Sequence, residues 1–140
     1  MTETHEVTVQ DVNESLELRG VFLHECHMQR GDAKHVKPGR VGGDIEITFQ
    51  HDDPKTVVYL VSVTTTLFNS DEELMAEIKA AFAAVYDSQI DATKIPPPLL
   101  ETYGHAARLQ VHPYLREFIA SISTRMGLPM FTAPVLRAKA

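Results

Sequence analysis

The sequence predicts an α+β fold in which antiparallel strands precede one long helix. Three observations support this prediction. Residues 45–50 alternate strictly between apolar and polar side chains, residues 56–68 form a run of β-branched and aromatic side chains, and apolar residues recur at helical spacing from Leu100 to Met126. The chain has 140 residues, which is the length of one ordinary domain. We therefore expect residues 1–140 to form a single domain.

Composition narrows the class of protein. Hydrophobic residues make up 44% of the chain and charged residues 23%, which is typical of a folded soluble protein. The formal net charge of -6 has the wrong sign for nucleic acid or an anionic membrane, so neither is an expected partner. The single cysteine, Cys26, cannot form an internal disulfide, and residues 1–10 lack the features of a signal peptide. No stretch approaches the roughly 18 apolar residues of a membrane span, so we expect a cytoplasmic protein.

The N-terminal part of the chain combines one strand with two irregular segments. Residues 1–14 show no clear period and are expected to form a loosely ordered lead-in. Residues 16–28 alternate around Gly20, which predicts a first strand with a bulge at the glycine. Residues 31–43 contain four glycines, a proline and four basic groups, and this composition predicts a surface loop.

A hairpin is predicted next. The alternation over residues 45–50 places Ile45, Ile47 and Phe49 on one face of a second strand. The turn sequence Asp52-Asp53-Pro54 follows it, and the β-branched run over residues 56–68 predicts a long third strand. We expect these two strands to pair antiparallel across the short turn.

Residues 71–86 fit two structures. Their apolar residues fall at helical spacing, and their alanine and glutamate content favours a helix. The same residues also alternate in a way that a strand permits. The residues by themselves leave this choice open.

A long helix is predicted for the C-terminal third, after the three prolines of residues 96–98. Pro113 lies inside it and removes one backbone donor, so the helix should kink or break after Val111. Gly127 predicts a C-terminal cap and Pro129 a stop. A short basic tail is expected over residues 137–140.

No catalytic or metal site is predicted from the histidines, the cysteine or the paired carboxylates. His24, Cys26 and His27 are metal-ligand types, but alternation on a strand places only His24 and Cys26 on one face. Nothing around Cys26 supports a nucleophile. His105 and His112 share a face of the predicted helix, where an ordinary surface position is the default and a metal between subunits the alternative. We expect no enzyme activity, no cofactor and no metal.

The C-terminal third resembles the SecB export chaperones. The resemblance rests on residues 112–129, which contain His-Pro-Tyr-Leu-Arg-Glu-Phe and end in Met-Gly-Leu-Pro, and on Ala133-Pro134-Val135. With the upstream order of elements it covers residues 16–136. It implies a four-stranded antiparallel sheet with the long kinked helix packed on one face. It also implies a fourth strand over residues 75–86 and a homotetramer built as a dimer of dimers.

The function implied by this resemblance is that of an ATP-independent chaperone, or holdase, which binds unfolded or extended polypeptides along hydrophobic grooves for export through SecA. Glu25 and Glu77 match acidic positions through which export members contact SecA, whereas Gln29 stands at a further position that is acidic in those members. The candidate client-binding residues are aromatic or aliphatic: Phe22, Met28, Phe49, Tyr59, Phe68, Tyr103, Leu128, Met130 and Phe131.

The resemblance leaves a second class of client open. Export members continue past the Ala-Pro-Val segment into another amphipathic helix, and the sequence up to Ala140 leads us to expect that this helix is missing here. Other SecB-like proteins belong to toxin–antitoxin systems and bind a hydrophobic C-terminal extension of the antitoxin. The expected partners are therefore unfolded preproteins with SecA or, alternatively, an antitoxin. A purely structural adaptor is the third hypothesis, and it predicts no affinity for unfolded chains.

Overall fold

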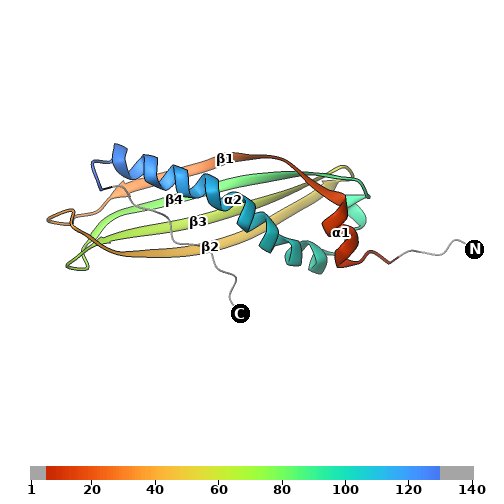
Figure 1. Ribbon diagram of the computed structural model, residues 1–140, viewed down its shortest axis with the longest axis horizontal. Helices are drawn as coiled ribbons and strands as arrows, with labels where there is room; N and C mark the ends of the chain where they lie inside the picture. Colours follow the sequence, from red (N-terminus) through yellow and green to blue (C-terminus); the bar gives the residue numbers. More distant parts are fainter. Residues whose placement is uncertain (1–5, 130–140) are drawn as a thin grey trace, which may run out of the picture.

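A computed structural model describes residues 6–129 of the chain. A four-stranded antiparallel sheet in the order β1-β4-β3-β2 forms one layer, and the long helix α2 runs obliquely over one of its faces (Figure 1). This confirms the expected fold class. The elements are α1 (Val9–Ser15), β1 (Leu16–Arg30), β2 (Pro38–Asp53), β3 (Thr56–Asn69), β4 (Leu74–Ser88), the 3-10 helix η1 (Ala92–Lys94) and α2 (Pro97–Arg125).

The predicted hairpin of β2 and β3 is confirmed. Ile47 pairs with Val61 and Phe49 with Tyr59, so the alternating apolar residues of both strands lie on the face that α2 covers. The predicted loop over residues 31–43 is wrong in its second half, because β2 begins at Pro38. Val41 pairs with Leu67 there. The long β-branched strand β3 supplies a pairing partner that the glycine-rich composition of this segment does not reveal.

The strand β1 contains the predicted bulge and a second one. Its register with β4 shifts between Leu18 and Gly20, as expected, and again between Leu23 and Glu25. Leu23 pairs with Phe82, which packs against α2, whereas Glu25 pairs with Ala81. The second bulge therefore leaves Leu23 on the face that α2 covers and Glu25 on the opposite face.

Residues 74–88 form the strand β4, as the family resemblance implied and against their helix propensity. β4 lies between β1 and β3 and pairs with both. Ile78, Ala80 and Phe82 are buried on the face that α2 covers. Hydrogen-bonded pairing along both sides of the strand outweighs the modest local preference for a helix.

The expected lead-in over residues 1–14 is wrong for residues 9–14, which belong to α1. Thr8 caps this helix: its Oγ1 accepts from the Asp11 backbone N–H at 3.2 Å, and Asp11 Oδ2 accepts from the Thr8 N–H at 2.9 Å. Val12 is buried in the core. A helix of seven residues with a capping box and one buried apolar residue is too short to show a hydrophobic period in the sequence.

The helix α2 is 29 residues long and continues through Pro113, so the expected break there is wrong, while a bend stays a prediction. Its C-terminal end is confirmed. Gly127 has φ 76° and its N–H donates to the Thr124 carbonyl at 3.0 Å, while the Leu128 N–H donates to the Ser123 carbonyl at 2.9 Å. This is a Schellman cap, in which the buried Leu128 packs back on the core. Within residues 6–129 no helix is long and apolar enough to cross a membrane.

Candidate functional site

The two edges of the sheet differ in chemistry. The β2 edge exposes Asp44, Glu46 and further polar side chains. The β1 edge instead exposes Phe22, Leu23 and Met28, with exposed fractions of 57%, 48% and 38%. Edge strands carry unpaired backbone groups and are usually protected by charged side chains. We call Phe22, Leu23 and Met28 the β1 apolar edge, and it offers both backbone groups and apolar side chains to another chain.

On the face that α2 covers, the β1 apolar edge continues onto the helix. Leu23 lies opposite Phe82, whose ring meets Phe118 of α2 edge to face with centroids 5.9 Å apart. Beyond Phe118, the side chains of Ile122 and Met126 are only partly buried against the core. Apolar surface therefore runs from the edge strand to the C-terminal half of α2.

The opposite face of the sheet, which we call the open face, has an apolar centre. Phe22 lies opposite Ala83, and Ala83 lies opposite Leu60 in the next strand. Val58 and Val85 pair in the neighbouring row, and both are half-buried. Phe22 thus joins the β1 apolar edge to an apolar row that crosses three strands.

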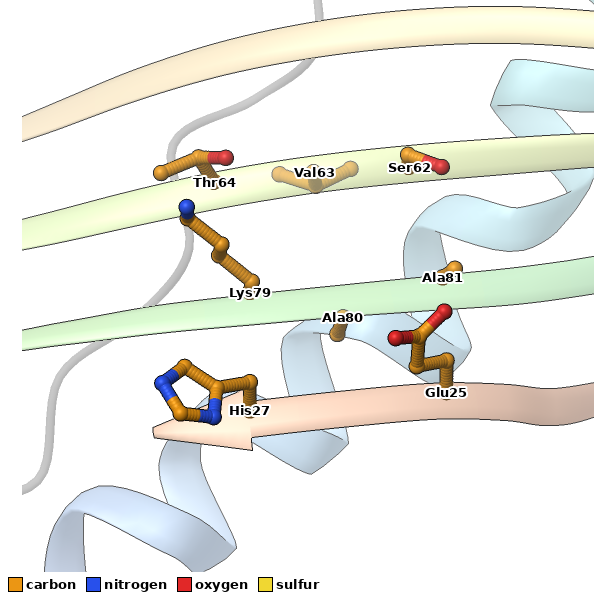
Figure 2. Close-up of a pocket in the computed structure, with 8 residues that line it drawn as sticks. All are labelled: Glu25, His27, Ser62, Val63, Thr64, Lys79, Ala80 and Ala81. Atoms are coloured by element: carbon orange, nitrogen blue, oxygen red, sulfur yellow. The ribbon is translucent and has the colours of Figure 1, made fainter. Parts of the chain in front are cut away.

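A shallow hollow with polar and charged side chains around it lies beside this apolar row (Figure 2). The hollow is surrounded by Glu25 and His27 of β1, Lys79 of β4 and Thr64 of β3. Small residues such as Ala81 form its floor. Lys79 Nζ lies 3.7 Å from Glu77 Oε1. Because both signs of charge surround the hollow, it offers polar contacts to another chain without a field of one sign.

The two acidic residues that match the SecA-contact positions lie on the open face. Glu25 is exposed and borders the hollow, and Glu77 is half-exposed beside Lys79. Gln29 pairs with Glu77 across the strands, so the family's additional acidic position would lie on the same face. The placement fits the expectation, and the contact with SecA stays a prediction.

The candidate client-binding residues fall into four groups. Phe22 and Met28 belong to the β1 apolar edge, whereas Phe49 and Phe68 are partly buried, with the Arg40 guanidinium 4.1 Å from the Phe68 ring centre. Met130 and Phe131 lie outside the described residues. The others, Tyr59, Tyr103 and Leu128, are buried.

Tyr59 is a core residue, which corrects its inclusion among the candidate client-binding residues. It has no exposed surface, and its hydroxyl donates to the Leu100 carbonyl at 2.6 Å. Burial, followed by the neighbouring Tyr103 and Tyr86, raises its pKa well above the usual range. An aromatic residue on a strand was expected to serve either the core or a client, and packing beneath α2 places Tyr59 in the core.

Sequence reasoning missed Leu23, the residue that joins the edge to the helix. The only signal was its neighbour Phe22, because two consecutive apolar residues cannot both face the core of a regular strand. Leu109 and Tyr114 of α2 were also missed as exposed residues, with exposed fractions of 61% and 45%. Helical spacing identified which face of α2 is apolar but not where the sheet beneath it ends.

The histidines and the cysteine of β1 do not assemble a reactive site. Cys26 pairs with Ala80 on the covered face and His27 pairs with Lys79 on the open face. Burial raises the pKa of the Cys26 thiol, which lowers its thiolate fraction and hence its nucleophilicity.

Within residues 6–129, one group of side chains has metal-ligand spacing: His35, Asp71 and Glu73. His35 Nδ1 accepts from the Lys37 backbone N–H at 3.2 Å, so the neutral ring carries its proton on Nε2, 2.7 Å from Asp71 Oδ2. Glu73 Oε1 accepts from the side chain of Asn69 at 2.8 Å. These contacts tie the segment after β1 to the turn between β3 and β4.

Comparison with known proteins identifies the fold. No protein-family model matches the sequence, and no curated protein matches it. Among solved structures, it is similar to the Mycobacterium tuberculosis SecB-like chaperone Rv1957 in complex with a ChAD peptide from the antitoxin Rv1956 HigA1. The TM-score is 0.76 at 20% sequence identity, over 91% of this chain and 95% of that one. The chain has the SecB-like fold. The fold implied by the resemblance of residues 112–129 and 133–135 is thereby confirmed.

Proposed function

We propose that this SecB-like chain is an ATP-independent chaperone, a holdase that binds unfolded or extended polypeptides. The observation that carries the proposal is the β1 apolar edge, where Phe22, Leu23 and Met28 are exposed on an edge strand. The backbone of an edge strand can pair with any extended chain, and apolar side chains beside it add affinity without demanding a sequence. The fold shared with a SecB-like chaperone supports the same function.

The energetics of such binding need neither a nucleotide nor a catalytic residue. Apolar surface contributes about 25 cal/mol per Å² removed from water, so three exposed side chains bind a client weakly. A longer client that reaches the open face through Phe22 and the helix through Leu23 gains affinity from several weak contacts at once. The client can therefore be held and still released for folding.

The test is suppression of aggregation. A denatured client is diluted with and without the purified chain, in the absence of nucleotide, and light scattering is recorded. The variant Phe22→Ser/Leu23→Ser/Met28→Ser should lose suppression. As a matched control, Val36→Ser/Leu74→Ser removes exposed apolar residues near the ends of the strands and should keep suppression. Equal suppression by both variants would contradict the proposal.

One of the comparisons suggests a specific class of client. The structurally similar mycobacterial chaperone is bound to a peptide of an antitoxin. We therefore propose an antitoxin as one client and test the ChAD peptide as a probe, expecting binding that the triple serine variant loses. Absence of ChAD binding with general suppression of aggregation would favour unfolded preproteins instead.

Export through SecA and assembly as a homotetramer remain parts of the proposal with tests of their own. Glu25→Gln/Glu77→Gln should abolish binding to SecA, while the control Glu46→Gln/Asp44→Asn removes two carboxylates near the β2 edge. Equal SecA binding by both variants would contradict the role of Glu25 and Glu77.

Light scattering coupled to gel filtration gives the oligomeric state, and a monomer would contradict the tetramer. A cytoplasmic location follows from this function and is checked by cell fractionation.

A further inference from the structure

Three side chains of metal-ligand type meet at one end of the sheet. His35 lies in the segment between β1 and β2, and Asp71 and Glu73 lie in the turn between β3 and β4 (Figure 1). One ligand atom from each side chain lies within 4.8 Å of the other two. Ligand atoms that share one Zn²⁺ lie about 3–4 Å apart, so small side-chain rotations bring these three within reach of one ion. No sequence motif marks the group, because 36 residues separate His35 from Asp71.

The turn between β3 and β4 sets the direction of both carboxylates. Asn69 Oδ1 accepts from the backbone N–H groups of Asp71 and Glu73, at 3.0 Å and 2.9 Å. Between these two residues, Glu72 has φ 62° and its carboxylate pairs with Arg40. A left-handed conformation is unfavourable for glutamate, so the surrounding contacts impose it. The turn thus presents the two flanking carboxylates to the segment after β1.

A buried amide connects the three ligand residues. Glu73 Oε1 accepts from the Asn69 side chain at 2.8 Å and from the Lys34 backbone N–H at 3.3 Å. The same Asn69 amide donates to the His35 carbonyl at 3.1 Å, and Asn69 has no exposed surface. Hydrogen bonds from outside a ligand set orient the ligands and strengthen metal binding. Asn69 therefore holds this set in place before any ion arrives.

Binding of a metal ion exchanges the hydrogen bonds of the imidazole. His35 Nε2 faces Asp71 Oδ2 at 2.7 Å, and a metal ion at Nε2 displaces the proton between them to Nδ1. Nδ1 then stops accepting from the Lys37 backbone N–H, which is a bond of 3.2 Å. Lys37 is exposed, so water replaces this acceptor at small cost. The Asp71 carboxylate gains a bond to the ion for the hydrogen bond that it loses.

We propose that His35, Asp71 and Glu73 bind one divalent transition-metal ion, with Zn²⁺ as the best match, and that the ion joins the segment after β1 to the turn between β3 and β4. One imidazole and two carboxylates are all ligands that Zn²⁺ accepts, and three protein ligands leave a fourth position for water. Ca²⁺ and Mg²⁺ prefer oxygen ligands, so the imidazole selects against them. The site uses no residue of α2 or of the β1 apolar edge and does not depend on the holdase function.

The experiment measures Zn²⁺ binding to the full, untagged chain after treatment with a chelator. Calorimetric titration should show saturable binding of one ion per chain. The affinity should fall at least about tenfold in His35→Gln/Asp71→Asn/Glu73→Gln, which removes all three ligands. Zn²⁺ should also raise the Tm of the original chain and leave that of this triple variant unchanged, because an ion that binds only the folded state stabilises it.

Two further variants serve as controls for composition and for folding. His24→Gln/Asp44→Asn/Glu46→Gln removes the same three residue types from exposed positions outside the group, and it should bind Zn²⁺ as the original chain does. Asp71→Asn changes a side chain that is 69% exposed, so it should weaken binding while the fold stays intact. Circular dichroism shows whether each variant is folded.

NMR spectroscopy gives a readout at the site itself. The ring nitrogens of His35 should exchange roles when Zn²⁺ saturates the chain, with the proton on Nδ1 and the ion on Nε2. The backbone amide signal of Lys37 should shift in the same titration, because its hydrogen bond to Nδ1 is lost. Neither change should occur in Asp71→Asn at the Zn²⁺ concentration that saturates the original chain.

Three outcomes would overturn the proposal. Binding could fail to saturate, the two triple variants could bind Zn²⁺ with equal affinity, or Zn²⁺ could shift the signals of another histidine and leave those of His35 unchanged. The last two would indicate an adventitious ion only. Suppression of client aggregation by Asp71→Asn should equal that of the original chain, so failure of the metal site and failure of the holdase proposal are distinguishable.

Discussion

The hydroxyl of Tyr59 in β3 donates to the backbone carbonyl of Leu100 in the first turns of α2, at 2.6 Å. Both side chains are fully buried. The bond joins two elements that lie 41 residues apart in the chain, and it holds the N-terminal part of α2 against the sheet. Edge-to-face contact between the rings of Tyr59 and Tyr86, with centroids 5.7 Å apart, fixes the orientation of the phenol.

Tyr59→Phe should lower the free energy of unfolding by about 1–2 kcal/mol, because a buried hydrogen bond is lost while the ring remains. Urea denaturation followed by circular dichroism measures the change. Tyr114→Phe is the control, since Tyr114 is exposed, and it should be neutral. A neutral Tyr59→Phe would show that the bond contributes nothing to stability.

Asn69→Ala should destabilise the chain by about 2–3 kcal/mol. The Asn69 side chain is buried, accepts from the backbone N–H groups of Asp71 and Glu73, and donates to the His35 carbonyl and the Glu73 carboxylate. Removing it leaves these groups unpaired. Asn13→Ala changes an exposed asparagine of α1 and should cost under about 0.5 kcal/mol in the same urea experiment. Equal effects would contradict the role of Asn69.

Gly127→Ala should lower the free energy of unfolding by about 1 kcal/mol. The positive φ of Gly127 lies in the left-handed region, where a Cβ atom is strained. Gly43→Ala serves as control, because Gly43 lies in the extended strand β2, and it should be neutral or slightly stabilising. Thermal denaturation of the two variants should therefore show a lower Tm for Gly127→Ala alone.

The stability of the chain should fall as His112 becomes protonated. Its pKa in the folded state is lower than the ordinary value of 6.5, so the unfolded state binds the proton more tightly. The stabilising contribution is complete above about pH 6.5 and is lost as the pH falls through the folded-state pKa. Urea midpoints from about pH 8 to about pH 5 should therefore decline less in His112→Gln than in the original chain. Identical declines would contradict the prediction.

The charges beside His112 provide a second test of the same environment. Arg108→Gln/Arg116→Gln should raise the pKa of His112 toward its ordinary value, because two like charges are removed while burial remains. NMR titration of the imidazole gives this pKa directly. The control Arg30→Gln/Arg125→Gln should leave it unchanged, and a shift of equal size there would show that the effect is not local.

The local sequence pattern was sufficient to predict those elements whose structure depends on neighbouring residues. The alternation around Ile47 and the turn after Asp53 predicted the hairpin, and Gly127 predicted the end of α2. β4 is the opposite case, because its alanine-rich segment fits both a helix and a strand. Its position between β1 and β3 decided the outcome, and the residues alone did not contain that information.

The sequence by itself determined the α+β class, the β2–β3 hairpin, the long C-terminal helix and the resemblance that implied the SecB-like fold. Only the tertiary structure decided that Tyr59 is a core residue while Phe22 and Leu23 form an exposed edge. Alternation sorts side chains onto two faces, but the part of each face that α2 covers depends on packing between residues far apart in the chain. The candidate binding surfaces are the parts left uncovered.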